Sequence, residues 1–187
     1  MQVEGLEALP RSGPVLIAGN HDSNMDPVAI GVSARRHRQI RALAKSSLWD
    51  VKPLAPILTG MGQIPIDRGA GDAHALDRAI ESLRAGACIG VFPEGTRSLG
   101  RTLRARSGIG RMAEAVPETV IVLVAVSGTT DFARFPKRPR ITIRFSRPAD
   151  GDYRLGEEHG AFAARLLEEI RAGVPPVAAG RRALRRR

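Results

Sequence analysis

Short apolar runs alternate with amphipathic stretches along this chain, and this alternation constrains the fold more than any other feature. The runs Val15–Ala18, Ala87–Phe92 and Val120–Val126 have the length and composition of buried strands. Between them, the stretch Asp72–Arg84 repeats apolar residues at helical spacing. Strands that alternate with helices predict an α/β fold, with a mostly parallel central sheet flanked by helices.

The remaining elements are expected to be shorter or less regular. Further strands are expected at Ile40–Ala44, at Gln63–Ile66, where Pro65 indicates an edge or an irregular end, and at Ile141–Phe145, whose alternation is typical of an exposed edge. The expected helices are Pro27–Arg35, a broken segment at Ser47–Leu58, Asp72–Arg84 with Asp72 as its cap, Ile109–Ala115, and a last helix marked by Phe162, Leu166 and Ile170.

The length of 187 residues is enough for one sizeable hydrophobic core. We therefore expect a single domain over residues 1–173, with the first strand leading into the functional loop. Pro175 and Pro176 end regular structure, and residues 174–187 are expected to form a disordered basic tail that carries Arg181, Arg182 and Arg185–Arg187.

The chain is strongly basic, since 29 Lys and Arg against 19 Asp and Glu give a net charge of +10. This charge favours an anionic partner, namely nucleic acid, an acidic membrane surface or a phosphorylated substrate. A GC-rich genome would also raise the arginine content. Aromatic residues make up only 4% of the chain, which weighs against a stacking platform for single-stranded nucleic acid.

The first residues and the single cysteine favour a cytoplasmic protein. The start Met1–Gly5 has neither a basic region nor an apolar stretch, so we expect no signal peptide. No run approaches the roughly 18 apolar residues of a membrane-spanning helix, which excludes such a helix within this sequence. Cys88 permits no internal disulfide, and a reducing compartment fits.

The stretch Asn20–Pro27 holds the first candidate catalytic residues. His21 follows an apolar strand and a Gly19-Asn20 turn, and Asp26-Pro27 reads as a helix start. Loops at the carboxyl ends of strands bind ligands in open α/β sheets. His21 and Asp26 could therefore form a dyad in which the carboxylate fixes the imidazole and the free ring nitrogen takes a proton. The alternative is a surface histidine and a simple helix cap.

Two further strand ends carry polar residues. Arg68 follows one strand, while Glu94, Thr96 and Arg97 follow another. If these strands are parallel to the first, the three groups converge on one crevice with His21. The planar guanidinium of an arginine suits a phosphate, and a neighbouring glycine lets the backbone approach closely.

Several of these segments resemble sequence boxes of the lysophosphatidic acid (1-acylglycerol-3-phosphate) acyltransferase family. Asn20–Asp26 matches the box N-H-x-x-x-x-D, and Phe92–Ser98 matches F-P-E-G-T-R-S at every position. Ile64–Arg68 is similar to an intermediate box that ends in Arg, and Arg106–Gly108 to a later basic-x-Gly element. The opening Val3–Pro10 looks like the lead-in to the family's first strand, so the resemblance runs from about residue 3 to about residue 130.

The resemblance implies direct transfer of an acyl group from acyl-CoA or acyl-ACP to the free hydroxyl of a lysophospholipid, with 1-acyl-sn-glycerol-3-phosphate as the first candidate acceptor. His21 would take the hydroxyl proton, Asp26 would orient the imidazole, and no acyl-enzyme, metal or cofactor would take part. Arginines would hold the acceptor's phosphate, and the glutamate and glycine would shape the glycerol site. The substrate-binding residues implied are Arg68, Glu94, Gly95, Thr96, Arg97 and Arg106.

Two departures from the family pattern bear on substrate and membrane. The fourth box is usually V-P-V-x, whereas this chain has Val122–Ala125 without the proline, so acceptor and chain-length preference are left open. Hydrophobic N-terminal helices, which seat many relatives on the bilayer, are absent from this sequence. We expect either that the chain is a fragment of a longer protein or that it makes peripheral contact with the anionic inner face of the cell membrane, through basic charge and an exposed apolar ledge near Trp49–Leu58.

Three other functions remain as alternatives. Gly19–Asp22 is also a signature of metallophosphoesterases, but none of the 18 preceding residues is Asp or His, and His37, His74 and His159 stand alone in the sequence. A serine hydrolase would need a G-x-S-x-G elbow, which this chain lacks. A basic membrane- or nucleic-acid-binding module fits the arginine tail, although no recognition motif supports it and nucleic acid is not an expected partner.

Overall fold

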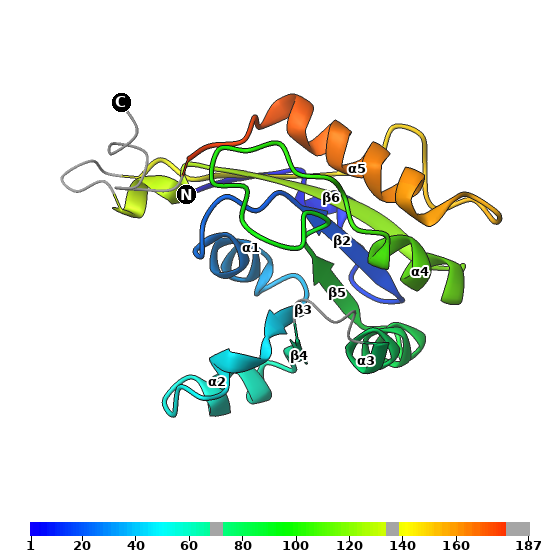
Figure 1. Ribbon diagram of the computed structural model, residues 1–187, viewed down its shortest axis with the longest axis horizontal. Helices are drawn as coiled ribbons and strands as arrows, with labels where there is room; N and C mark the ends of the chain where they lie inside the picture. Colours follow the sequence, from blue (N-terminus) through cyan, green and yellow to red (C-terminus); the bar gives the residue numbers. More distant parts are fainter. Residues whose placement is uncertain (68–72, 134–138, 179–187) are drawn as a thin grey trace.

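A seven-stranded sheet forms the centre of the molecule (Figure 1). The structure is a computed structural model that describes residues 1–67, 73–133 and 139–178. The order of the strands across the sheet is β1-β7-β6-β2-β5-β3-β4. Their bounds are β1 Gln2–Glu4, β2 Val15–Gly19, β3 Ile40–Lys45, β4 Ile64–Ile66, β5 Cys88–Val91, β6 Val120–Ser127 and β7 Thr142–Ser146.

All pairings in the sheet are parallel except that of β6 with β7, which is antiparallel. The predicted α/β fold with a mostly parallel central sheet is confirmed. β2 lies between β6 and β5, and the side chains of Val15–Ala18 are almost completely buried. Burial on both faces explains why this strand reads as a continuous apolar run.

Helices cover both faces of the sheet (Figure 1). Leu16 and Ala18 of β2 pack with α3, α4 and α5 on one face, while Val15 and Ile17 pack with α1 on the other. The helices are α1 Asp26–Ala34, α2 Ala55–Gly60, α3 Ala73–Arg84, α4 Gly108–Ala115 and α5 His159–Gly173, with single 3₁₀ turns at Leu6–Ala8, Ser46–Leu48 and Thr129–Ala133.

Two predicted elements differ from the structure. The prediction of an edge at Ile141–Phe145 is wrong, because β1 pairs with β7 through Gln2–Glu4 and occupies the edge itself. The three-residue β1 has no apolar run of its own, which is why the sequence did not reveal it. The broken helix predicted at Ser47–Leu58 is a 3₁₀ turn followed by the separate helix α2.

Two other expectations about the ends of elements have different outcomes. β4 does lie at an edge of the sheet, as Pro65 indicated. The cap predicted at Asp72 lies outside the described residues.

None of the helices in the described ranges is long and apolar enough to cross a membrane.

Parallel pairing places the functional loops side by side. Ala18 pairs with Val91, so β2 and β5 end next to one another. The loops that leave these two strands carry His21 and Glu94. On one face of the sheet, α4 and α5 pack so closely that a Cβ at Gly110 would lie 2.6 Å from the Cα of His159. This close contact fixes the position of α5 relative to the sheet.

Candidate active site

The loop after β2 is anchored to the neighbouring strand by Asn20. The side-chain amide of Asn20 donates to the carbonyl of Val126 at 2.8 Å, and its oxygen accepts from the N–H of Val126 at 2.7 Å. Asn20 is completely buried, so these two bonds satisfy groups that would otherwise lose contact with water. They fix the point at which the chain turns into His21.

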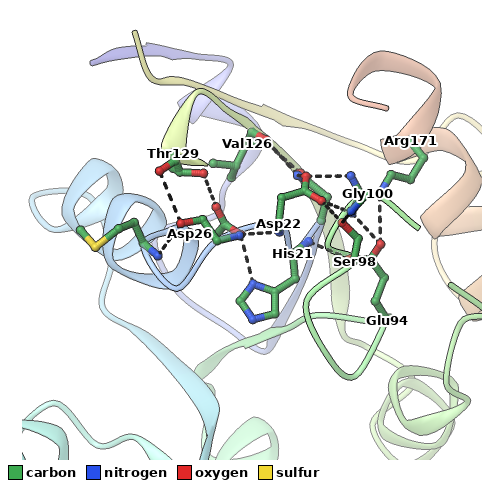
Figure 2. Close-up of polar contacts among 12 residues, drawn as sticks. His21, Asp22, Asp26, Glu94, Ser98, Gly100, Val126, Thr129 and Arg171 are labelled. Atoms are coloured by element: carbon green, nitrogen blue, oxygen red, sulfur yellow. Dashed lines mark hydrogen bonds and ion pairs between the residues drawn. The ribbon is translucent and has the colours of Figure 1, made fainter. Parts of the chain in front are cut away.

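His21 and Asp26 form a buried pair at this loop (Figure 2). Nδ1 of His21 lies 3.1 Å from Oδ2 of Asp26. The same Oδ2 accepts the backbone N–H groups of Asp22 and Ser23 at 2.7 Å each, and Oδ1 accepts the hydroxyl of Thr129 at 2.5 Å. The carboxylate therefore has a single orientation, directed at the imidazole.

The role of Asp26 at the helix start differs from the cap that the sequence suggested. Helix α1 begins at Asp26 itself, and Met25 precedes it without a side-chain cap. The Asp26 carboxylate turns back to bond the loop N–H groups rather than those of the helix. It stabilises the loop conformation, and only Pro27 performs its expected role in the first turn.

The imidazole of His21 is packed on its face and unbonded at its outer nitrogen. The ring stacks on Phe92 with centroids 4.2 Å apart and planes 16° from parallel. Among the described residues, Nε2 has no hydrogen-bond partner. Because Asp26 accepts at Nδ1, the neutral ring carries its proton there and leaves the lone pair of Nε2 available. This is the geometry that a general base needs.

Glu94 lies beside His21, but both of its oxygens are already bonded within the protein. Oε2 accepts the backbone N–H of His21 at 2.7 Å, and Oε1 accepts from Arg171 at 2.6 Å. Ser98, at the far end of the same loop, donates its N–H to the carbonyl of His21 at 2.8 Å. The loop after β5 thus holds the main chain of His21 at both its N–H and its C=O.

Arg171 and Asp22 complete the cluster, and sequence reasoning missed both. The two nitrogens at the end of Arg171 donate to the two carboxylate oxygens of Asp22 at 2.8 and 3.0 Å. Ser98 also donates its hydroxyl to Asp22. Burial raises the pKa of Asp22, while the hydrogen bonds from Arg171 and Ser98 lower it, and the net pKa lies below the ordinary value. The sequence carries no local signal for this pair, because the burial of the two carboxylates, which makes a nearby cation necessary, follows only from the fold.

The other predicted binding residues lie along the loop after β5. Gly95 has φ near 68°, and a Cβ there would lie 3.2 Å from the side chain of Arg106, so glycine lets these segments approach. Thr96 and Arg106 are exposed and Arg97 is half-buried. The backbone N–H of Arg106 donates to the carbonyl of Pro93 at 2.8 Å, but the guanidinium groups of Arg97 and Arg106 have no hydrogen-bond or ion-pair partner in the described part of the chain. The predicted residue Arg68 lies outside the described residues.

A cavity of about 580 Å³ lies between α3 and α4. Its wall includes Phe92, the residue on which His21 stacks, together with Gly95 and Arg106. Most of its lining is apolar, from Leu43, Ile66, Leu76, Val91, Ile109 and Met112. The volume and lining are typical of a site for an apolar small-molecule group.

Comparison with known proteins gives similarities over most of the chain. The sequence model of the Acyltransferase family matches residues 1–127. A 1-acyl-sn-glycerol-3-phosphate acyltransferase of Borreliella burgdorferi is 35% identical over 133 residues, which cover 70% of this chain and 52% of that protein. A Bacillus subtilis protein of the same name is 30% identical over 151 residues, which cover 81% of this chain and 65% of its own length. This chain thus spans between half and two thirds of these two relatives.

The fold also has a counterpart among solved structures. The 1-acyl-sn-glycerophosphate acyltransferase PlsC of Thermotoga maritima superposes with a TM-score of 0.70 at 24% sequence identity. The match covers 100% of this chain and 72% of the other. At this level of identity the comparison shows a shared fold.

Proposed function

The chain belongs to the acyltransferase family, as its sequence boxes indicated, and from this premise we propose that it transfers a fatty acyl group to the free hydroxyl of a lysophospholipid. The donor is acyl-CoA or acyl-ACP, and the first candidate acceptor is 1-acyl-sn-glycerol-3-phosphate, which becomes phosphatidic acid. The observation that carries this proposal is the buried His21–Asp26 pair beside an apolar cavity.

In the proposed reaction His21 is the general base. Nε2 takes the proton of the acceptor hydroxyl as its oxygen attacks the thioester carbonyl carbon. Asp26, held by three donors besides the imidazole, stabilises the positive ring that forms. The tetrahedral intermediate then breaks its C–S bond, and the leaving thiolate takes the proton from His21. Bonds and protons balance without an acyl-enzyme or a cofactor.

The cavity between α3 and α4 suits the acyl chain of one substrate. Burial of methylene groups there would contribute about 0.8 kcal/mol per CH₂ group. Phe92 belongs both to the cavity wall and to the stack with His21, so a chain bound in the cavity would end next to the base. The thioester or the hydroxyl would then lie within its reach.

The acceptor's phosphate is assigned to the arginines at the mouth of the site. Arg97 and Arg106 are the predicted binding residues with guanidiniums free of partners among the described residues, and Arg106 lines the cavity. Ser98, directly after Arg97, bonds the main chain of His21. Arg97 is therefore adjacent in sequence to Ser98, which contacts the main chain of His21. Arg68 remains a predicted third contributor.

We also propose that the protein lies peripherally on the anionic inner face of the cell membrane. Four side chains on and around α2 are large, apolar and between 37% and 56% exposed, and we name them the apolar ledge: Leu48, Val51, Ile57 and Met61. Figure 1 shows this segment projecting from the sheet beside β3 and β4. An exposed apolar group on a chain with net charge +10 suits a surface that offers both acyl chains and negative headgroups.

The test of this function is incubation of the protein with acyl-CoA or acyl-ACP and a panel of lysophospholipids, with product detected by mass spectrometry. The expected product is the diacyl phospholipid of one acceptor, formed without added metal and lost in H21A. Product formation that chelator abolishes and that H21A retains would favour a metal-dependent enzyme. Vesicle binding without any product would favour a basic binding module.

A further inference from the structure

We propose that Arg171 of α5 is a positioning residue that holds the loop of His21 in its reactive conformation by joining the two carboxylates beside that histidine. The kinetic part of this inference rests on the proposed acyl transfer. Arg171 does not touch the imidazole, and Figure 2 shows it on the opposite side of the loop from Asp26 and Thr129.

Every donor of the Arg171 guanidinium has an acceptor. Nε donates to Oε1 of Glu94 at 3.1 Å, and Nη2 donates to the same oxygen at 2.6 Å and to Oδ1 of Asp22 at 3.0 Å. Nη1 donates to Oδ2 of Asp22 at 2.8 Å and to the carbonyl of Val174 at 3.2 Å. The planar fork of arginine makes this double bridge possible, and the single ammonium of a lysine does not.

The two carboxylates transmit this constraint to the base. Glu94 accepts the N–H of His21, and the N–H of Asp22 bonds Oδ2 of Asp26, the atom that faces Nδ1 of the imidazole. A shift of either carboxylate therefore displaces the main chain on one side of His21. Displacements on the order of 1 Å at a reacting group cost roughly 100-fold in rate.

Burial makes Arg171 necessary for this arrangement. The side chains of Asp22 and Glu94 are 4% and 1% exposed, and that of Arg171 is 12% exposed. Two carboxylates cannot remain ionised and close together in such a site without a cation. With Arg171 removed, one of them must take up a proton or move toward water, and either change breaks the set of bonds around His21.

The same bonds give Glu94 a different role from the one its sequence box implies. Both of its oxygens are committed, one to His21 and one to Arg171, so neither is open to a glycerol hydroxyl. We assign Glu94 to the positioning cluster, and leave Arg97 and Arg106 to bind the acceptor. Arg171 belongs to α5, which lies beyond the residues 1–127 that match the family. The active-site loop of this chain is therefore supported from outside the matched region.

The test compares R171M with R165M, a control on the same helix. Arg165 is also partly buried and ion-paired, with Nε 2.7 Å from Glu157, but it bonds loop 151–157 and not the His21 loop. R171M should lower kcat by roughly 100-fold, with little change in the KM of donor or acceptor. R165M should lower thermal stability and leave kcat near the wild-type value. R171K, which keeps the charge but not the fork, should fall between them and serves if R171M does not fold.

An activity-independent measurement separates this inference from the proposed function. Amide hydrogen exchange is followed by NMR for His21, whose N–H bonds Glu94, and for Ile17 in the centre of β2. In R171M the His21 amide should exchange at least about tenfold faster relative to Ile17, and in R165M the ratio should stay unchanged. A wild-type protein inactive on every acceptor would contradict the proposed function, while the exchange ratio would still decide on Arg171. An unchanged ratio in R171M, or a kcat no lower than that of R165M, would overturn the inference.

Discussion

At the scale of single residues, Asp26 is the group whose replacement discriminates best between a base-orienting role and a purely structural role in the loop. We expect D26N to lower kcat by roughly 10²–10⁴-fold, because an amide no longer stabilises the positive imidazole and can select the wrong tautomer of His21. Stability should also fall, since the carboxylate accepts two loop N–H groups. Steady-state kinetics and urea unfolding measure the two effects. A D26N variant with reduced stability and normal kcat would mean that the carboxylate is purely structural.

Arg97 should contribute to acceptor binding rather than to chemistry. A charged hydrogen bond to phosphate contributes about 1.5–3 kcal/mol, so R97A should raise the KM for lysophosphatidate by roughly ten- to a hundredfold and that for the acyl donor much less. An acceptor that lacks a phosphate monoester provides the control and should be nearly indifferent to the substitution. If instead the donor's KM rises alone, Arg97 binds the phosphates of the donor.

The Asp22–Arg171 pair makes a prediction about pH. The pKa of Asp22 is below its ordinary value of 3.8, so the ionised group stabilises the fold above that pH, and this stabilisation is lost as the pH falls through the lowered pKa. In R171M burial dominates and the pKa of Asp22 rises, with His21, Asp26 and Glu94 as the nearest titratable groups. The variant should be about 3 kcal/mol less stable at neutral pH, and the gap should narrow as the pH falls. Urea unfolding at neutral pH and near pH 4 tests this, and a constant gap would contradict it.

At the scale of elements, the cavity between α3 and α4 should set the preferred acyl length. Leu76 lines it from near the N-terminus of α3 and is only partly buried, so a larger side chain can enter the cavity without disrupting the core. We expect L76W to lower kcat/KM for long-chain acyl-CoA far more than for short-chain acyl-CoA. L76A is the matched control and should preserve or extend the range of chain lengths. Equal losses for all lengths in L76W would show that the chain binds elsewhere.

The elements that the sequence predicted well are those with strong local signals. β2, β5 and β6 are apolar runs that need burial on both faces, and parallel pairing of such runs brings the loops of His21 and Glu94 together. The family boxes that cover these loops are confirmed by the match over residues 1–127. In these elements the local sequence pattern agrees with the global fold, so they could be predicted from the sequence.

The elements that it missed depend on contacts distant in the sequence. β1 forms because it pairs with β7, about 140 residues away in the sequence. The residues Gln2–Glu4 alone show no pattern that predicts a strand. Arg171 reaches Asp22 across 149 positions, so its role appears only when α5 is folded against the sheet. In the sequence it is one of two arginines on a helix with a polar outer face, in a chain that is rich in arginine.

At the scale of the whole molecule, the proposed membrane contact predicts that charge and the apolar ledge make separable contributions to vesicle binding. Deletion of residues 181–187, which lie outside the described ranges, should weaken binding to anionic vesicles at low salt by about 1 kcal/mol per arginine near the surface. I57N, which removes apolar surface without changing the net charge, should weaken binding at low and at high salt alike, because burial of apolar surface is not screened. Co-sedimentation with vesicles at two salt concentrations measures both, and turnover of a soluble short-chain acceptor serves as the control. A tail deletion that lowers turnover and binding equally would indicate a structural tail.

His21 is the proposed base of the acyl transfer, and the turnover of H21A is the decisive measurement of that role. The imidazole contributes a ring stack with Phe92, so circular dichroism and thermal unfolding must first show that H21A is folded. With a verified acceptor and acyl donor, we expect a loss of roughly 10²–10⁴-fold in kcat for the folded variant. A folded H21A that turns over at nearly the wild-type rate would show that His21 is not the base.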